Sequence, residues 1–567
     1  MSPQLLVTLS FGLPLAFLAA FYFYPLAAIF QTSFANGDAR GFVELFSDGY
    51  YARVLAFTIF QAAASTLLTL IAALPAAYIF ARYTFRGANI LRALTTIPFL
   101  MPTIVVATAF SALFGPRGSV NLTLMQLFQL DQPPIQILNT VWVILLAHVF
   151  YNFTIVLRIV GGFWSNLDPQ IENAARVLGA NRARTFWHVT LPLIAPAIVA
   201  AALLVFIFDF TSFGVVLILG GARLTTLEVE IYRQTVNIFD LPLAAALSLV
   251  QLVCTFALMI IYTRLQARLA QPLKLRPPSI IRRKLQTARE NFFAWGYLAS
   301  MLIFLMTPLV SIVAASFENG FDYYTELFVN RRGSIMFVPP IDAVRNSLVF
   351  AAVTVLLATT LGLIAAYSLN PRDHRPQTTD RYPPSKWQSV VGGLRSILST
   401  KTLDAVYMLP LGTSAVTLGF GYILALGNLR TSVWLVPIVH ALVAFPFVVR
   451  SLLPILRSIQ PRLREAAQVL GASPARVWRE IDFPIIIRAV IVGAVFAFTV
   501  SMGEFGATTL VARPEMPTIP LAIYRFLGQP GLINFGQALA LSTILMVVSG
   551  IAIVAMERLR VGDVGEF

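Results

Sequence analysis

Charged residues and cysteines are scarce in this chain. Only 12% of its 567 residues are Asp, Glu, Lys or Arg, while 57% are hydrophobic, and the mean hydropathy is +0.77. Soluble domains contain about 25% charged residues, so the composition excludes an ordinary soluble domain and predicts that lipid is the main solvent. The single cysteine, Cys254, excludes a disulfide framework within one chain.

The net charge of +15 does not indicate nucleic-acid binding. The basic residues lie in short segments between apolar runs, which is the pattern of membrane topology signals. A basic domain that binds nucleic acid would need a polar surface, and no such segment is present.

Motifs for catalysis are also missing. The sequence has no G-x-x-x-x-G-K-[ST] segment that would bind nucleotide phosphates. It shows no Ser/His/Asp or H-E-x-x-H arrangement either. The four histidines have no metal-ligand spacing, and we expect the repeat-equivalent pair His148 and His440 to pack as polar groups at helix ends. We therefore predict no enzyme active site, no bound cofactor and no metal, so energy must come from a partner.

Twelve apolar runs reach the length of about 20 residues that a membrane span needs. They cover about 5–30, 55–81, 93–114, 138–162, 192–220, 241–263, 292–316, 346–369, 403–426, 433–456, 484–511 and 533–556. If the chain starts inside, 30 Lys and Arg residues lie on the cytoplasmic side and 11 on the outer side. This asymmetry predicts that both termini are cytoplasmic. The first run is predicted to be an uncleaved span, because no Lys or Arg precedes it and it is longer than the roughly 7–15 residues of a signal-peptide core.

The two halves of the chain repeat each other. A constant shift of 292 residues maps His148 onto His440, Phe213-Gly214 onto Phe505-Gly506, and Ile231-Tyr232-Arg233 onto Ile523-Tyr524-Arg525. Each half holds six spans, an even number, so both repeats face the same way about a pseudo-twofold axis along the membrane normal. The predicted fold is an all-α membrane protein with two parallel six-helix repeats. Its predicted domains are 1–270, a basic cytoplasmic linker at 271–291, and 292–567.

A charged, amphipathic segment occurs in both halves: "IENAARVLGANRARTFWHVTLP" (171–192) and "LREAAQVLGASPARVWREIDFP" (463–484). We call these the first and second loop modules. A glycine at 179 or 471 predicts the end of a short helix, because glycine adopts the left-handed conformation cheaply. Asn181 in the first module, and Ser473 with Pro474 in the second, predict the start of a second short helix. In the second module this helix is expected to end near Pro484. One alternative is an interfacial helix that only anchors the loop.

The loop modules resemble the EAA loop of ABC importer permeases, whose short helix docks on a separate ATPase subunit. The first module has Asn173 at the position of the glutamate, and Glu172 stands one place early. The resemblance implies that the docking loops contain Glu172, Ala174, Ala175, Gly179, Pro192, Glu465, Ala466, Ala467, Gly471 and Pro484.

The segment before the first module, "LLAHVFYNFTIVLRIVGGFW", looks like fused permeases for thiamine and ferric iron, especially the thiamine branch. In the second half, "SMGEFGATTL" is similar to a segment common among oxyanion and iron permeases. The resemblance implies a type I ABC importer permease in the bacterial cell membrane. It would be fed by an extracytoplasmic solute-binding protein and driven by two ATPase subunits that use ATP. Both thiamine and ferric iron remain open as substrates.

Two acids, Asp209 and Glu504, lie within predicted spans. An ionisable residue at membrane depth indicates function by default, and the shift of 292 places Glu504 opposite Ser212, three residues from Asp209. The acids could therefore line one translocation path together with the neighbouring Phe213, Gly214, Phe505 and Gly506. The alternative is that each acid only pairs with backbone or arginine groups, or lies near the outer water.

A secondary transporter with twelve spans, driven by an ion gradient, is the alternative of another class. It would explain the parallel repeat and the two acids within spans. It would not explain two EAA-like modules between spans 4 and 5 and between spans 10 and 11. A membrane-bound enzyme is a third possibility, which no residues support.

Overall fold

The computed structural model describes residues 12–34, 39–269, 282–331, 335–370, 399–429 and 432–559. Most of the predicted loop at 370–402 and of the linker at 271–291 lies outside these residues. Helices dominate the described part, whose strands are β1 (Tyr83–Thr84) and β2 (Arg283–Lys284), paired in parallel.

Within the described residues, eleven helices are long and apolar enough to cross a membrane. A twelfth is possible if the pair Thr400–Gly412 and Ala415–Ala425, bent by 95°, is one span. The prediction of an all-α membrane protein with twelve spans is confirmed. The third span differs from the predicted 93–114: Pro102 separates α5 (Ala88–Leu100) from α6 (Thr103–Phe114), since proline cannot donate a helix hydrogen bond.

The chain forms two compact units, and each combines separate stretches of sequence. The first unit contains residues 1–38, 328–522 and 547–565. Its main layers are α18 (Ile341–Ser368), α22 (Leu435–Ser458) and α25 (Phe483–Gly503), which pack on one another. The helix α2 (Tyr24–Ser33) packs on α21 (Ala415–Ala425), and nearby the hydroxyls of Tyr22 and Thr413 lie 2.7 Å apart. The first helix of the chain therefore packs with spans of the second half.

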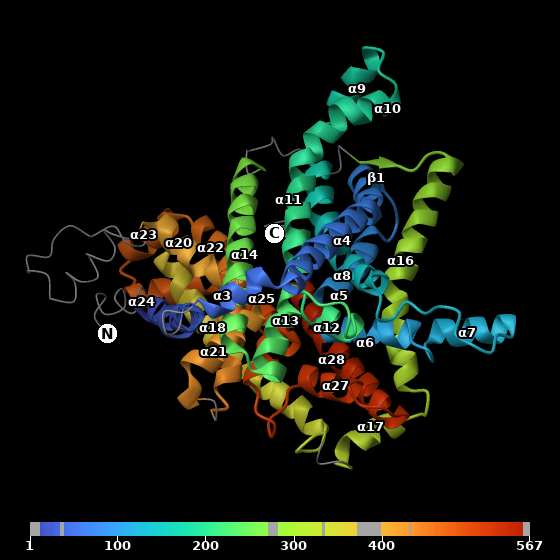
Figure 1. The fold of residues 1–567 in the computed structure, drawn as a ribbon. Helices are drawn as coiled ribbons and strands as arrows, with labels where there is room; N and C mark the ends of the chain where they lie inside the picture. The colour runs from blue at the N-terminus through green and yellow to red at the C-terminus, as the bar shows by residue number, and fades with distance from the viewer. Residues whose placement is uncertain are drawn as a thin grey trace, which may run out of the picture. The chain divides into compact units, whose positions relative to one another are not determined.

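The second unit contains residues 39–327, 523–546 and 566–567. The long helix α4 (Gly49–Arg82) runs along α8 (Val141–Ser165), and α11 (Leu191–Phe210) packs on both (Figure 1). Around them lie α3 (Arg40–Ser47), α14 (Leu241–Leu269) and α16 (Ala288–Ser316), while α7 (Ser119–Phe128) extends outward from α6. The last helices, α27 (Ile519–Leu527) and α28 (Leu532–Leu559), each contribute residues to both units. The domain boundaries drawn from the repeat stay a prediction.

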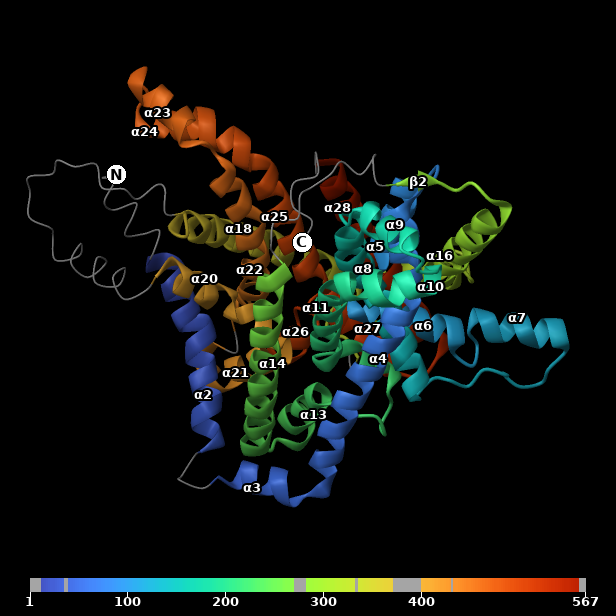
Figure 2. The same cartoon turned by 90° about the horizontal axis from the view of Figure 1, so that it is seen from above.

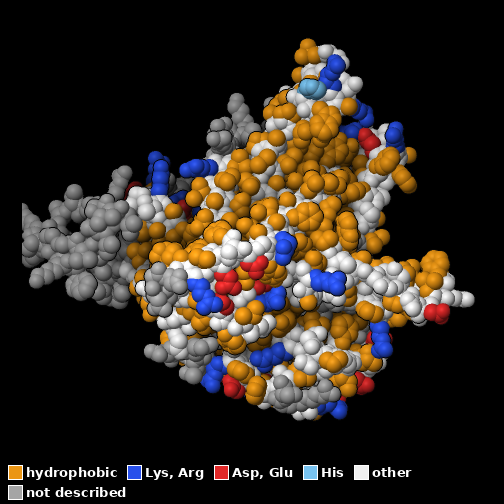
Figure 3. Space-filling view, viewed as in Figure 1, with side chains coloured by type: hydrophobic (Ala, Val, Ile, Leu, Met, Phe, Trp, Pro, Cys, Tyr) orange, Lys and Arg blue, Asp and Glu red, His pale blue; other side chains and the backbone are white. Residues whose placement is uncertain are grey.

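The outer surface of the second unit is apolar along its helices. On α4, Phe60, Leu67 and Ile71 are exposed and share one helix face. Figure 3 shows a broad hydrophobic surface over α4 and α11. Such a surface is stable only against lipid, which agrees with the composition.

Candidate functional site

The first loop module is a helix, a left-handed turn and a second helix. Asp168 caps α9 (Pro169–Val177) by accepting a hydrogen bond from the Gln170 amide at 3.0 Å. Gly179 has φ +89°. The amides of Gly179 and Ala180 donate to the carbonyls of Arg176 and Ala175, both at 3.0 Å. These two bonds form a Schellman motif, which satisfies carbonyls that the end of α9 leaves open.

The second loop module repeats this turn. The helix α23 (Pro461–Val469) ends at Gly471, whose φ is +81°. The amides of Gly471 and Ala472 donate to Gln468 and Ala467 at 2.9 and 3.0 Å. The two predicted glycine turns are confirmed.

The predicted caps of the second helices are confirmed as well. Asn181 Oδ1 accepts from the Arg184 amide at 2.8 Å, at the start of α10 (Arg182–Thr185). In the second module, Ser473 Oγ accepts from the Arg476 amide at 3.4 Å, at the start of α24 (Pro474–Val477).

The prediction that the second helix ends near Pro484 is wrong. The helix continues into the next span through a π-helical turn, Phe186–Thr190 before α11 and Trp478–Asp482 before α25. A proline in a continuing α-helix clashes with the preceding turn and removes one hydrogen bond. The wider π turn accommodates Pro192 and Pro484 without a break.

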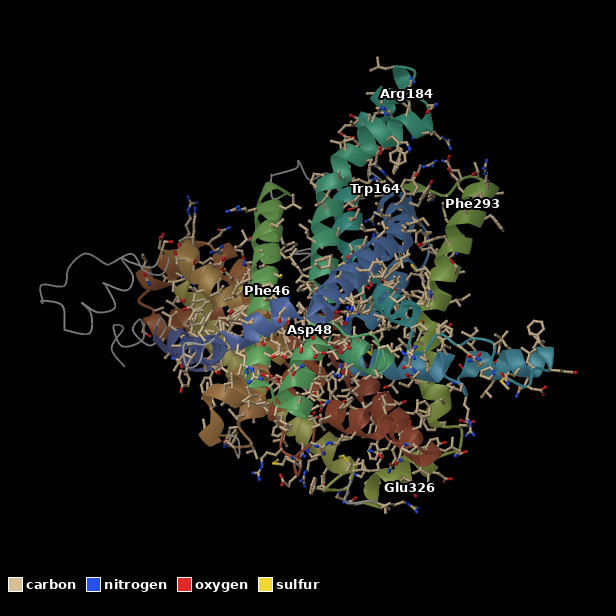
Figure 4. The ribbon with its side chains drawn as sticks, in the orientation of Figure 1. Phe46, Asp48, Trp164, Arg184, Phe293 and Glu326 are labelled. Carbon is tan, nitrogen blue, oxygen red and sulfur yellow. The ribbon has the colours of Figure 1, made fainter. Side chains whose placement is uncertain are left out.

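Each module presents an apolar pair at its tip. Val177 and Leu178 are 86% and 88% exposed, and their repeat equivalents Val469 and Leu470 are 87% and 86% exposed. Figure 1 shows α9 and α10 beyond the end of α11, and Figure 2 shows α23 and α24 beyond the end of α25. Arg184 points outward from the first tip (Figure 4). The same residue types are exposed at equivalent positions, so both modules offer one kind of surface.

Glu172 faces its own chain. Its carboxylate forms an ion pair with Arg82 on α4 and accepts a hydrogen bond from Thr190 Oγ1 at 3.0 Å. In the second module, the residues at the equivalent positions are Arg464 and Asp482, whose side chains pair at 2.8 Å. A polar pair thus joins each module to the helix that follows it. The acid lies in the short helix of the first module, at Glu172, and at the start of the following helix in the second module, at Asp482. The sequence analysis missed this role of Glu172. The shift of 292 could have revealed it, because it aligns Glu172 and Thr190 with Arg464 and Asp482, a pair of opposite charge.

Helix breaks follow α11 and α25. The helix α11 ends at Phe210, and α12 (Gly214–Leu219) begins after three residues. The helix α25 ends at Gly503, and α26 (Gly506–Val511) begins after Glu504 and Phe505. The predicted spans 192–220 and 484–511 therefore each divide at the Phe-Gly pair. Phe213, Gly214, Phe505 and Gly506 are all buried.

A histidine lies beside each break, inside α8 and α22 rather than at helix ends. His148 Nε2 and Ser212 Oγ are 2.8 Å apart, and His148 Nδ1 lies 3.5 Å from Asp209 Oδ1. His440 instead has Ser501 Oγ at 2.8 Å from Nδ1 and Glu504 Oε2 at 3.3 Å from Nε2. Asp209 and Ser501 are repeat equivalents, as are Ser212 and Glu504. At these two equivalent positions each histidine has one acid and one serine, and the acid and the serine have exchanged places between the repeats.

The two acids differ in how their oxygens are satisfied. Glu504 lies directly after α25 and caps α26: its oxygens accept from the amides of Ala507 and Thr508, both at 2.9 Å. Asp209 lies in the last turn of α11, where Oδ1 accepts from Asn152 Nδ2 at 2.6 Å. Asp209 Oδ2 has no hydrogen-bond partner. Glu504 therefore has the backbone partners of the alternative, together with the Thr508 hydroxyl at 2.6 Å and His440. The carboxylate of Asp209 instead bonds to the side chain of Asn152.

Two repeat-equivalent tyrosines meet in the second unit. Tyr232, on α13 (Leu227–Arg233), shares a side-chain hydrogen bond with Tyr524 of α27. The ring of Phe213 packs edge-on against Tyr232, with centroids 5.4 Å apart. Burial, followed by the neighbouring Tyr524, raises the pKa of Tyr232, so its hydroxyl stays protonated near neutral pH. The repeated Ile-Tyr-Arg showed that these two tyrosines are equivalent, but the sequence did not predict that they are in contact. Among the described residues, no group of three or more His, Cys, Asp or Glu residues could hold a metal ion.

Comparison with known proteins gives a consistent result for both halves. The family described as "Binding-protein-dependent transport system inner membrane component" matches residues 69–271 and again residues 392–559. These two matches contain the loop modules and the helix breaks.

Relatives of similar length align over most of the chain. The thiamine transport system permease protein ThiP of Salmonella typhimurium strain LT2 is 26% identical over 514 residues, which is 88% of each chain. The protein of the same name from Brucella abortus strain 2308 is 26% identical over 91% of this chain and 89% of its own.

One solved structure with partial similarity is the bacterial alginate ABC transporter in complex with an alginate pentasaccharide-bound periplasmic protein. The match covers 45% of this chain and 92% of that chain, with 17% identity and a TM-score of 0.39. A TM-score this low does not establish a shared fold.

Proposed function

Because the chain belongs to the family of inner membrane components of binding-protein-dependent transport systems, we propose that this multi-pass permease works as an ABC importer with two separate ATPase subunits. The ATPase subunits would dock on the two loop modules and hydrolyse ATP, while an extracytoplasmic solute-binding protein delivers the solute. The chain itself would bind no cofactor and catalyse no reaction. The observation that carries this proposal is the pair of exposed modules at equivalent positions in the two repeats.

The geometry of the modules suits docking. Val177 and Leu178, like Val469 and Leu470, are more exposed than a soluble surface favours, and covering them would remove apolar area from water. The small side chains of Ala174 and Ala175 in α9, and of Ala466 and Ala467 in α23, would let a partner approach the helix closely. Gly179 and Gly471 would set the angle of the tip, and Glu465 is exposed beside it.

The polar pairs would hold each module at one angle to the membrane helices. Glu172 would act in this way through Arg82 and Thr190, and the same role in the second module would belong to Arg464 and Asp482. A module held rigidly would transmit a displacement of the ATPase subunit to α11 or α25. Continuity through the π turns at Pro192 and Pro484 supports this coupling.

The proposed orientation places both modules and both termini in the cytoplasm of a bacterial cell. The excess of Lys and Arg on that side of the predicted spans supports it. The basic tip around Arg184 lies on the same side in this orientation.

Thiamine is the solute that we propose first. Two relatives that align over about nine tenths of this chain are named as thiamine transport permeases. Ferric iron remains the second candidate, on the sequence resemblance described above.

We also propose that the path runs past the two helix breaks. Phe213 and Gly214, with Phe505 and Gly506, would form the parts of the path that change shape. Asp209 and Glu504 would act on the path by holding these breaks, since both acids are buried and bonded within the chain.

Uptake in proteoliposomes tests the proposal. The vesicle membrane would contain this chain together with its ATPase subunits. The binding protein and labelled thiamine would be added on the side of the membrane that corresponds to the cell exterior. Uptake should require both the ATPase subunits and ATP. Robust uptake by this chain alone under a proton or sodium gradient would instead establish a secondary transporter.

A further inference from the structure

Three buried oxygen atoms around Asp209 lack hydrogen-bond donors. They are Asp209 Oδ2, Asn152 Oδ1 and Gln61 Oε1, and all three side chains are 0% exposed. They come from α11, α8 and α4, which pack on one another in the second unit. Native proteins leave only a few buried polar groups per 100 residues without a partner, so three such oxygens on residues that contact one another are unusual.

The hydrogen bonds of the amide groups identify these atoms as oxygens. Gln61 Nε2 donates to the backbone oxygens of Thr58 at 3.2 Å and Asp209 at 2.7 Å. Only the NH2 group can donate to two carbonyl oxygens, so Gln61 Oε1 is the remaining acceptor. Asn152 Nδ2 likewise donates to Asp209 Oδ1 at 2.6 Å. Both amides thus bond to Asp209 through nitrogen and keep an oxygen unsatisfied nearby.

The charge of Asp209 is not matched by an arginine or lysine. In the part of the chain that the structure describes, its ion-pair partner is His148, at 3.5 Å. The ring nitrogens of His148 also have serine hydroxyls close by, Ser65 at 3.0 Å and Ser212 at 2.8 Å. A buried carboxylate is stable only when it is neutralised or bound by positive charge.

We propose that Asp209, Asn152 and Gln61 form a binding site for a monovalent alkali cation, sodium or potassium, which goes beyond the transport function proposed above. Oxygen atoms are the ligands that hard cations prefer. One carboxylate supplies one negative charge, so a monovalent ion leaves the buried site neutral and a divalent ion does not. A proton on Asp209 would be donated to only one other oxygen, whereas a metal ion binds several oxygen atoms at once.

The site belongs to the first repeat alone. The shift of 292 replaces Asn152 by Ala444 and Asp209 by Ser501. In the earlier helices the shift is 289, as the equivalent contacts of Thr58 and Ser347 show, and it replaces Gln61 by Phe350. Glu504, the other buried acid beside a histidine, is already satisfied by backbone amides. One cation per chain would therefore tie the last turn of α11 to α4 and α8.

Thermal unfolding of the full-length purified protein tests the site. The parent protein would be compared in sodium chloride, potassium chloride and choline chloride at equal ionic strength and fixed pH. A ligand that binds the folded state raises its stability with its concentration. We expect a saturable rise in unfolding temperature with sodium or potassium over choline, and the larger rise identifies the ion.

Asp209→Asn should lose this cation response, and Glu504→Gln should keep it as the matched control. If Asp209→Asn does not fold, Asn152→Ala and Gln61→Val carry the test, because each removes one proposed oxygen ligand and keeps the charge of Asp209. Equal unfolding temperatures of the parent protein in all three salts would overturn the proposal. A full cation response in the folded site variants would overturn it too, as would a stability that follows pH alone.

Discussion

Valine at Gly179 and Gly471 should uncouple the two loop modules from their partner without unfolding the membrane helices. Both glycines have positive φ values, +89° and +81°. An added Cβ would meet no atom within 4 Å at either position. The cost of the substitution is therefore conformational and does not come from a steric clash with a neighbour.

The size of the effect follows from that conformation. The left-handed region costs a residue with a Cβ roughly 1–2 kcal/mol. If the valine left the left-handed conformation, the hydrogen bonds that the amides of residues 179–180 and 471–472 donate would break. A change of about 1–2 kcal/mol alters a conformational ratio by about 5- to 30-fold. The apparent dissociation constant for the ATPase subunit should rise by about that factor for each module.

The assay measures co-purification of the ATPase subunits with the detergent-solubilised permease, and transport-coupled ATP hydrolysis in proteoliposomes. Gly179→Asn is one control, because asparagine tolerates the left-handed conformation. Gly296→Ala is the second control: Gly296 lies inside α16, and its added Cβ also meets no atom within 4 Å.

The unfolding temperature should stay near the parental value, because neither α9 nor α23 contains a buried residue. Normal association and coupling in the folded Gly179→Val, Gly471→Val double variant would refute the assignment of these turns to docking.

Three further predictions follow from single contacts. Glu172→Ala should lower coupled ATP hydrolysis severalfold while ATPase binding persists, because the module loses its link to α4 but keeps its exposed tip; unchanged coupling would contradict this role. Gly362→Ala should destabilise the protein by roughly 1–3 kcal/mol, since its Cβ would lie 2.5 Å from Val448 Cγ1, and chemical denaturation should show no such loss for the Gly296→Ala control. Glu504→Gln should lower uptake per assembled complex more than basal ATP hydrolysis, because it weakens the cap of α26; parental uptake would show that the cap is not needed for transport.

The repeat and the loop turns could be predicted because they depend on local chemistry. A span needs only a long apolar run. A glycine after an amphipathic helical turn commonly ends the helix, as Gly179 and Gly471 do. The repeat also paired Phe213-Gly214 with Phe505-Gly506, but the helix breaks beside them became visible only in the structure. The continuity of the helices through Pro192 and Pro484 could not be predicted in this way, because a π turn is a rare solution that local propensity does not favour.

The contacts between distant residues were decided by the tertiary structure. Sequence alone indicated that Asp209 and Glu504 are acids at membrane depth, with Ser212 three residues from Asp209. It could not show that Glu504 is satisfied by the amides of α26 while Asp209 keeps an unsatisfied oxygen. Glu172, too, lay one place before the glutamate of a docking motif, and only the tertiary structure shows that its carboxylate pairs with Arg82 of α4.

The sequence by itself determined the membrane class, the parallel repeat and the two exposed modules of this protein, because composition, hydrophobic run length and glycine positions act within a few turns of helix. The tertiary structure alone decided which polar groups meet. In the buried interior a carboxylate takes its role from the donors that surround it, and the donors and acceptors around Asp209 come from positions 61, 148 and 152, far from it in the chain.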